Sequence, residues 1–197
     1  MELIPADPLV VLAPVANALE QLGVRYHVGG SLASSAHGLP RASADVDLVA
    51  ELRNEHVDAF VHSLEADYYL AREQILEAIG QRAAFNLIHL STMMKVDIFV
   101  PGSHPFEEQE MSRARPEALD PAPSARTFFV KSAEDVVLRK LSWYRAGREV
   151  SERQWSDVIG VLKVKADQLD ADYLVRWAAE LEVDDLLYRA LAEAEDG

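Results

Sequence analysis

The 197-residue chain contains no cysteine, which excludes disulfide bonds, thiolate metal sites and a cysteine nucleophile. Long apolar runs are also missing, since the stretch from Leu9 to Val15 is too short to cross a membrane and includes Pro14. We find no signal peptide, and so we expect a cytoplasmic protein without a membrane partner. Basic residues are scarce too. The resulting net charge of −14 argues against indiscriminate binding to nucleic acid or anionic membranes.

The composition is otherwise that of an ordinary globular protein. Apolar residues make up 49% of the chain and charged residues 26%, and the length allows one large domain or a domain with an appendage. The basic residues are concentrated in the middle of the sequence. Residues 111–165 hold eleven Lys and Arg against seven Asp and Glu. A focused phosphate site is compatible with this pattern, and so is a solvated helical surface.

Residues 28–50 contain the pattern that most clearly suggests chemistry. A short apolar run ends in Gly-Gly-Ser at 29–31, and a segment of small residues suited to a short helix follows. Farther along, Asp45 and Asp47 alternate with apolar residues, which predicts a strand. Alternate residues of a strand point to the same face. The two carboxylates would therefore lie side by side and repel each other unless a cation neutralises them.

The glycine pair and the two aspartates together suit a nucleotide. Glycine lets the backbone approach a ligand closely, and the start of a helix offers unpaired N–H groups to an anion. We therefore expect Gly29, Gly30 and Ser31 to contact phosphate groups. Asp45 and Asp47 suit a hard divalent ion such as Mg²⁺, which usually keeps positions for water and substrate phosphates. These features predict a site for a nucleoside triphosphate (NTP).

A family resemblance rests on the same residues. The Gly-Ser pair followed by Asp-Val-Asp-Leu at 45–48 resembles the signature of the nucleotidyltransferase superfamily related to DNA polymerase beta. The arrangement Arg41-x-Ser43-x-Asp45-x-Asp47 is similar to minimal nucleotidyltransferases and to the AbiEii-like toxins of toxin–antitoxin systems. The resemblance implies two Mg²⁺ ions, each held by both aspartates, and adds Arg41 and Ser43 to the nucleotide-binding candidates. The alternatives are an ion pair for Arg41 and a backbone partner for the Ser43 hydroxyl.

Asp97 is the third carboxylate candidate. It lies in the otherwise apolar run 95–100, which predicts the second strand of a hairpin. A buried carboxylate without a partner is costly unless it is neutralised or ligates a metal. An outward-facing position at a strand edge is the alternative. The resemblance implies that Asp97 completes a metal triad with Asp45 and Asp47, and that it lies near the acceptor, whose proton it can take.

Three further candidates lie in the C-terminal half. The resemblance implies that Lys140 corresponds to a helical lysine that helps to hold phosphate in AbiEii-like proteins. Their next motif, Lys/Arg-Asp-x-x-Asp, is matched at Arg153 and Asp157, whereas Gln154 replaces its first aspartate and is explained by helix capping. Arg153 and Asp157 are four residues apart on a predicted helix. A surface pair worth a few tenths of a kcal/mol is therefore the alternative.

We expect an α/β (α+β) fold, in which a mixed sheet flanked by helices is followed by a C-terminal helical bundle. Residues 1–130 are predicted to form a nucleotidyltransferase catalytic domain, and residues 131–197 a helical subdomain. Residues 103–126 are predicted to be a connector with one short helix. The predicted strands cover 24–28, 45–50, 68–70, 84–90, 93–100 and 127–130. The predicted helices cover 9–22, 31–37, 54–65, 72–79 and 105–112. Four more follow, and Ser132, Ser151 and Asp170 are the predicted N-caps of the first three.

The leading functional hypothesis is Mg²⁺-dependent transfer of a nucleoside monophosphate (NMP) from an NTP to a hydroxyl acceptor, with release of pyrophosphate. The sequence does not choose between an RNA end, a protein and a small molecule such as an aminoglycoside as the acceptor. The main alternative is a non-catalytic nucleotide-binding or toxin–antitoxin module, with an antitoxin as its partner. A third hypothesis is a metal-dependent phosphohydrolase, which would label no acceptor.

Overall fold

A computed structural model of the protein describes residues 7–122 and 125–195. The described residues group into two compact units. The sheet unit lies within Met1–Gly29 and Ala42–Val130, and the helical unit lies within Gly30–Arg41 and Lys131–Gly197. The chain therefore enters the helical unit twice. No local sequence pattern indicates that the short segment 30–41 groups with the C-terminal helices.

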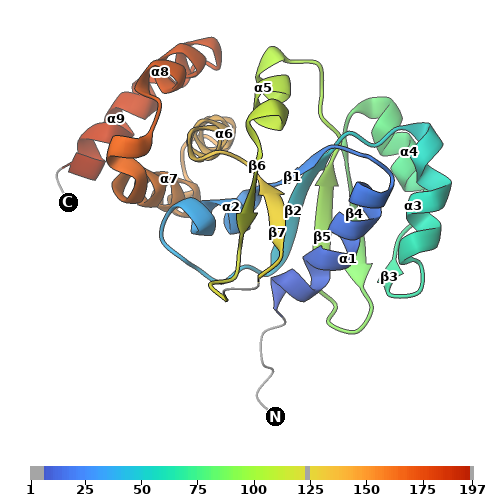
Figure 1. Ribbon diagram of the computed structural model, residues 1–197. Coiled ribbons are helices and arrows are strands. Elements are labelled where there is room, and N and C mark those ends of the chain that lie inside the picture. The colour runs from blue at the N-terminus through green and yellow to red at the C-terminus, as the bar shows by residue number, and fades with distance from the viewer. Residues whose placement is uncertain (1–6, 123–124, 196–197) are drawn as a thin grey trace. The chain divides into compact units, whose positions relative to one another are not determined.

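A single mixed sheet forms the centre of the sheet unit (Figure 1). Its strands are β1 (Tyr26–Val28), β2 (Asp45–Ala50), β3 (Tyr68–Tyr69), β4 (Ala84–His89), β5 (Lys95–Phe99), β6 (Arg115–Ala118) and β7 (Thr127–Val130). Their order across the sheet is β3-β4-β5-β2-β1-β7-β6. β2 pairs with β5 in parallel, as β1 does with β7, and the other neighbours are antiparallel. The predicted hairpin of β4 and β5 is confirmed.

Helices cover one face of this sheet. The sheet unit contains α1 (Pro8–Gln21), the 3₁₀ helix η1 (Asn54–His56), α3 (Val57–Leu64), α4 (Arg72–Gln81) and α5 (Pro105–Arg113). α1 packs against β2 and α3, while α4 packs against α3 and β4. The Tyr68 hydroxyl donates a hydrogen bond of 2.6 Å to the Val11 carbonyl, which ties β3 to α1. Burial raises the pKa of this hydroxyl to about 12.

The alternation of side chains in β2 and β5 decides what each face of the sheet presents. Val46 and Leu48 in β2, and Val96 and Ile98 in β5, are fully buried. Their side chains belong to the hydrophobic core, whose burial is the main favourable term in folding. The intervening residues of both strands are more exposed. The polar residues of the two strands therefore share the opposite face.

The helical unit is a set of contacting helices. It consists of α2 (Gly30–His37), α6 (Ala133–Ala146), α7 (Glu152–Lys165), the 3₁₀ helix η2 (Ala166–Gln168), α8 (Ala171–Glu180) and α9 (Asp184–Glu195). Side chains of Ser132, Ser151 and Asp170 cap α6, α7 and α8 by accepting backbone N–H groups, as predicted. α2 packs against α6 and α7. A Cβ on Gly38, just after α2, would lie 2.8 Å from the Val161 nitrogen of α7.

The predicted fold class is confirmed: a mixed sheet with helices is followed by the C-terminal helices α6–α9. One strand was missed, because residues 115–118 were assigned to a connector, whereas they form the edge strand β6. Another difference is that β5 begins at Lys95 and not at Met93, which has φ 58° and lies in the turn before the strand. Within the described residues no helix is long and apolar enough to span a membrane.

Candidate functional site

Asp45, Asp47 and Asp97 lie on one face of two adjacent parallel strands, and we call them the carboxylate row. Asp47 of β2 is the direct neighbour of Asp97 of β5, and Asp45 is the neighbour of Lys95. Neighbouring strands are about 4.8 Å apart. The residues on either side, Val46 and Val96, point to the core. The predicted juxtaposition of the three carboxylates thus follows from strand register, and β5 is an interior strand, not an edge strand.

Two short-range contacts orient the row. The Ser43 hydroxyl lies 2.8 Å from the Asp45 carbonyl oxygen and 3.1 Å from its Oδ1. Ser43 therefore has the backbone partner that was its alternative assignment, and it also steadies the carboxylate. The buried Gly29 donates its N–H to the Asp47 carbonyl over 2.9 Å. This bond extends the β1–β2 pairing to the glycine pair.

Lys95 is a fourth member of this face that the sequence reading did not single out. Its Nζ lies 2.7 Å from Asp97 Oδ2, and its side chain is 47% exposed against 18% for Asp97. The hydrogen bond to Asp97 raises the pKa of Lys95 against partial burial, and the charges of Asp97, Asp45 and Asp47 act in the same direction. A lysine two residues before the aspartate on the same strand was the available signal.

The chemistry of the carboxylate row fits Mg²⁺, because carboxylate oxygens are the ligands this ion prefers. In the described part of the chain, however, no group of three or more His, Asp or Glu side chains is arranged to hold a metal ion. At Asp97, Oδ2 is paired with the ammonium group of Lys95 at 2.7 Å. The row thus combines three carboxylates with one lysine, whose ammonium group contacts Asp97.

Two of the predicted phosphate contacts, Gly30 and Ser31, belong to the start of α2 in the helical unit, whereas Gly29 ends the first segment of the sheet unit. Gly30 has φ 53°, a backbone conformation that favours glycine. Its carbonyl accepts a hydrogen bond of 2.7 Å from the Ser34 hydroxyl. Ser31 is 7% exposed, and its side chain is therefore largely covered in this structure. The helix has no acidic residue in its first turn, which suits binding of an anion there.

Asp157 joins two of the predicted basic residues into one cluster. Arg41 donates two hydrogen bonds of 2.8 Å to the two oxygens of Asp157. Lys140 Nζ lies 2.8 Å from Asp157 Oδ2 and donates to Gln154 Oε1 over 2.9 Å. Burial alone raises the pKa of Asp157, but the bonds from Arg41 and Lys140 outweigh it and hold the pKa below its ordinary value. We call Arg41, Lys140 and Asp157 the ion cluster.

The ion cluster decides whether Asp157 forms a surface pair with Arg153, which was one of the alternatives from the sequence. The side chains of Lys140 and Asp157 are only 5% and 6% exposed, and that of Arg41 is 28% exposed. Arg153 is exposed, and in the described residues it makes no ion pair with Asp157. The surface pair of Arg153 and Asp157 is therefore wrong, because α7 turns Asp157 inwards to α2 and α6. The ion pair considered for Arg41 does form.

A small cavity connects the glycine to further basic residues of the helical unit. Gly30, Lys131, Val136, Arg139, Lys140 and Trp143 line it, and its volume of about 10 Å³ is roughly that needed for one water molecule. Lys131 and Arg139 were not among the predicted residues, although Arg139 adjoins Lys140 in the sequence. Three basic residues thus lie beside Gly30, of which Lys140 is paired with Asp157, and the cavity must open to admit a phosphate group.

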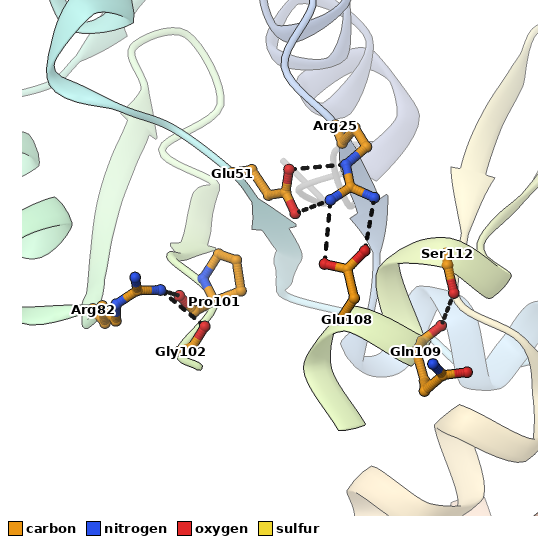
Figure 2. A network of polar contacts seen from close by, with 8 residues as sticks. All are labelled: Arg25, Glu51, Arg82, Pro101, Gly102, Glu108, Gln109 and Ser112. Carbon is orange, nitrogen blue, oxygen red and sulfur yellow. Dashed lines mark hydrogen bonds and ion pairs between the residues drawn. The ribbon is translucent and has the colours of Figure 1, made fainter. Parts of the chain in front are cut away.

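A larger cavity, of about 760 Å³, lies at the far end of β2 and β5. Figure 2 shows its polar groups, in which Arg25 bridges Glu51 and Glu108 and Arg82 binds two loop carbonyls. Glu51 is four residues beyond Asp47, or about 13 Å along an extended chain. These groups pair with one another and hold α5 and the loop after β5. We therefore interpret this network as structural.

No protein-family model and no curated protein matches the sequence, but solved structures match the fold. An antigenic nucleotidyltransferase-like protein from Paracoccidioides brasiliensis is 17% identical, with a TM-score of 0.55 over 95% of this chain and 94% of that one. The antibiotic-resistance factor ANT(2'')-Ia is 16% identical in its solution structure, with a TM-score of 0.52 over 95% and 96% of the two chains. Its crystal structure with adenylyl-2''-tobramycin is 13% identical, with a TM-score of 0.54 over 88% and 96%.

These similarities extend over most of each chain and show a nucleotidyltransferase fold. The resemblance that the sequence suggested is confirmed at that level. The identities are too low to carry residue roles from one protein to another.

Proposed function

We propose that the protein is a Mg²⁺-dependent nucleotidyltransferase that transfers an NMP from an NTP to a hydroxyl acceptor and releases pyrophosphate. The observation that carries the proposal is the carboxylate row on a nucleotidyltransferase fold. Asp47 and Asp97 are register neighbours, and Asp45 shares their face. Three carboxylates concentrated on two strands are unfavourable for stability alone, since neighbouring like charges repel. Their placement is more readily explained by a ligand of opposite charge.

The carboxylate row would hold the metal ions. Asp45 and Asp47 are the proposed ligands of both ions, and Asp97 is the proposed ligand of the ion nearer the acceptor. Bound Mg²⁺ would supply the positive charge that stabilises the attacking and leaving oxygens in phosphoryl transfer. Ser43 positions Asp45. Asp97 is also the proposed base for the acceptor hydroxyl, once Lys95 no longer holds its Oδ2.

The glycine pair and the basic residues of the helical unit are the proposed contacts for the triphosphate. Gly29, Gly30 and Ser31 are proposed to bind phosphate through backbone N–H groups and the serine hydroxyl. Lys140 is the proposed phosphate-binding cation, joined by Lys131 and Arg139, which line the same cavity as Gly30. Asp157 is a positioning residue, because it holds Arg41 and Lys140 in place through its two oxygens. For Arg153, an exposed residue of α7, we retain only a peripheral nucleotide contact.

The class of acceptor can be identified by a direct screen. One structural relative was crystallised with adenylyl-2''-tobramycin, which makes an aminoglycoside one reasonable probe. A net charge of −14 is favourable for a cationic small molecule and unfavourable for a long RNA. An RNA 3′ end and a protein hydroxyl, including that of an antitoxin partner, complete the set of acceptors to be tried.

The test is transfer of label from α-³²P-labelled NTPs in the presence of Mg²⁺. Each of the four NTPs is incubated with tobramycin, a short RNA or the protein itself, and pyrophosphate is measured alongside the labelled product. We expect labelled acceptor and an equal amount of pyrophosphate. Activity should fall by at least about 10³-fold in Asp47→Asn, because a shared metal ligand is lost.

The controls separate the alternative functions. Asp58→Asn removes one carboxylate from the surface of α3, away from the row, and should leave activity unchanged. Release of free NMP or phosphate without labelled acceptor would indicate a phosphohydrolase. Saturable NTP binding without any turnover, over the whole acceptor panel, would favour the non-catalytic nucleotide-binding or toxin–antitoxin module. Either result would contradict the proposed transfer reaction.

A further inference from the structure

Lys95 is the cationic neighbour of the carboxylate row, and its position is set by the same register as the aspartates. It lies opposite Asp45 on the parallel strand and two residues before Asp97 on its own strand. Its side chain therefore belongs to the same face as all three carboxylates. The fully buried Val96 between Lys95 and Asp97 fixes this orientation, since a change of register would bury the charges.

The contact of Lys95 with Asp97 uses an oxygen that a metal ion would need. Nζ lies 2.7 Å from Asp97 Oδ2, which is the length of a charge-assisted hydrogen bond. The three carboxylates carry three negative charges, and Lys95 contributes one positive charge beside them. A divalent ion at Asp97 would place two positive charges beside the ammonium group. The two cations therefore exclude each other from Asp97 on electrostatic grounds.

The side chain of Lys95 is also able to move away from Asp97. Its side chain is 47% exposed, whereas that of Asp97 is 18% exposed. A long flexible stem that is half in solvent can move its ammonium group into water at small cost, whereas the aspartate is fixed in an interior strand. The pair thus combines a stationary carboxylate with a mobile cation.

We propose that Lys95 is a displaceable internal counter-ion, which neutralises the carboxylate row in the metal-free protein and must release Asp97 before a divalent ion binds there. This inference rests on the proposed function, because it takes the carboxylate row to be a metal site. Its consequence is that the metal-free site is stabilised at the expense of metal affinity. Free metal is bound weakly, and the metal that arrives with its nucleotide is favoured because the phosphates can interact with the released ammonium group.

The test measures Mn²⁺ affinity without nucleotide, by titrating the protein and following free Mn²⁺ by electron paramagnetic resonance. Lys95→Met keeps the length of the side chain and removes its charge. We expect this variant to bind Mn²⁺ about two- to fivefold more tightly than the wild type, because one partly exposed competing charge is lost. Lys95→Arg retains the charge and should bind like the wild type.

Two controls show whether the contact itself is responsible. Arg53→Met also removes one positive charge from the sheet unit, at an exposed position after β2, and should leave the affinity unchanged. In an Asp97→Asn background, Lys95→Met should increase Mn²⁺ affinity much less, because position 97 no longer has a carboxylate for which the lysine and the metal compete. An equal gain in Arg53→Met, or unchanged or weaker binding in Lys95→Met, would overturn the counter-ion role.

The failure of the inference is distinguishable from the failure of the proposed function. If Asp45→Asn and Asp47→Asn abolish Mn²⁺ binding while Lys95→Met binds like the wild type, the metal site stands and Lys95 is not a counter-ion. If neither the wild type nor Lys95→Met binds Mn²⁺ at millimolar concentration, the metal site and the counter-ion role are both contradicted.

Discussion

Asp47 and Asp97 are direct neighbours on the parallel strands β2 and β5. They are 50 positions apart in the sequence, and only the pairing of the two strands brings them together. The same register sets Lys95 opposite Asp45, so that one cation and three anions share a small area of one face. The stability and the ligand affinity of the sheet unit should therefore be linked through this area.

Replacement of Asp47 by Asn should stabilise the metal-free protein. The variant loses one of two adjacent negative charges, and we expect its free energy of unfolding to rise by about 0.5 kcal/mol. Urea denaturation in the presence of a chelator measures this change. Asp58→Asn should give no such gain, because its carboxylate accepts a hydrogen bond from Arg72. A loss of stability in Asp47→Asn would contradict net repulsion between the neighbouring carboxylates.

Removal of Asp157 should destabilise the helical unit strongly. Asp157→Ala leaves Lys140, whose side chain is 5% exposed, without its anionic partner. Leaving a buried charge unpaired costs about 3 kcal/mol. Thermal or urea unfolding of the variant measures this effect. Lys140→Met in the Asp157→Ala background should recover part of the loss, whereas a small effect of Asp157→Ala alone would mean that water replaces the carboxylate.

The ion cluster should also make stability depend on pH in the acid range. The pKa of Asp157 in the folded protein is below its ordinary value of 3.8, so protonation favours the unfolded state. Its contribution is complete above the ordinary pKa and is lost as the pH falls through the folded value. The difference in unfolding free energy between wild type and Asp157→Asn should be constant from about pH 8 to about pH 5 and shrink below 3.8. A difference that persists unchanged at lower pH would contradict the ion cluster.

Replacement of Gly38 and of Gly80 by alanine should have opposite effects on stability. A Cβ on Gly38 would lie 2.8 Å from the Val161 nitrogen and 2.9 Å from the Gly160 carbonyl carbon. Backbone atoms cannot yield locally, and we expect Gly38→Ala to cost about 2 kcal/mol. Nothing lies within 4 Å of a Cβ on Gly80 in α4, and Gly80→Ala should stabilise by about 0.5 kcal/mol. Urea unfolding of both variants checks the contrast, and equal effects would contradict the packing.

Arg25 should contribute a modest and salt-sensitive stabilisation. Its guanidinium group binds Glu51 and Glu108, but the side chain is 51% exposed. We expect Arg25→Met to lower the free energy of unfolding by about 0.5–1 kcal/mol at low salt and by less at high salt. A double-mutant cycle with Glu108→Gln isolates the contact with α5. A coupling energy near zero in that cycle would show that Arg25 does not hold α5.

The sequence was sufficient for the features that depend on local pattern. Alternation gave β2 with Asp45 and Asp47 on one face, and side-chain caps gave the starts of α6, α7 and α8. β6 was missed because its Arg-Pro-Glu-Ala sequence has neither β-branched residues nor an apolar alternation. Such a strand forms at a sheet edge, where its unpaired side tolerates proline.

Contacts between segments that are far apart in the sequence could not be predicted from local sequence patterns. Arg41 and Asp157 are 116 positions apart, and their pairing depends on the packing of α2 against α7. The alternative of a surface ion pair between Arg153 and Asp157 was wrong for the same reason, because helical spacing does not show which face α7 buries. Lys131 became a candidate only when it was found to line the same small cavity as Gly30 and Lys140.

The central claim is that the carboxylate row holds a metal-bound NTP. Its most direct test is calorimetric titration of ATP, GTP, CTP and UTP, with and without Mg²⁺, into wild type and an Asp45→Asn/Asp47→Asn variant. We predict Mg²⁺-dependent binding of at least one NTP by the wild type and its loss in a variant that remains folded. Equal binding by both proteins, or no binding of any NTP by folded wild type, would contradict the account.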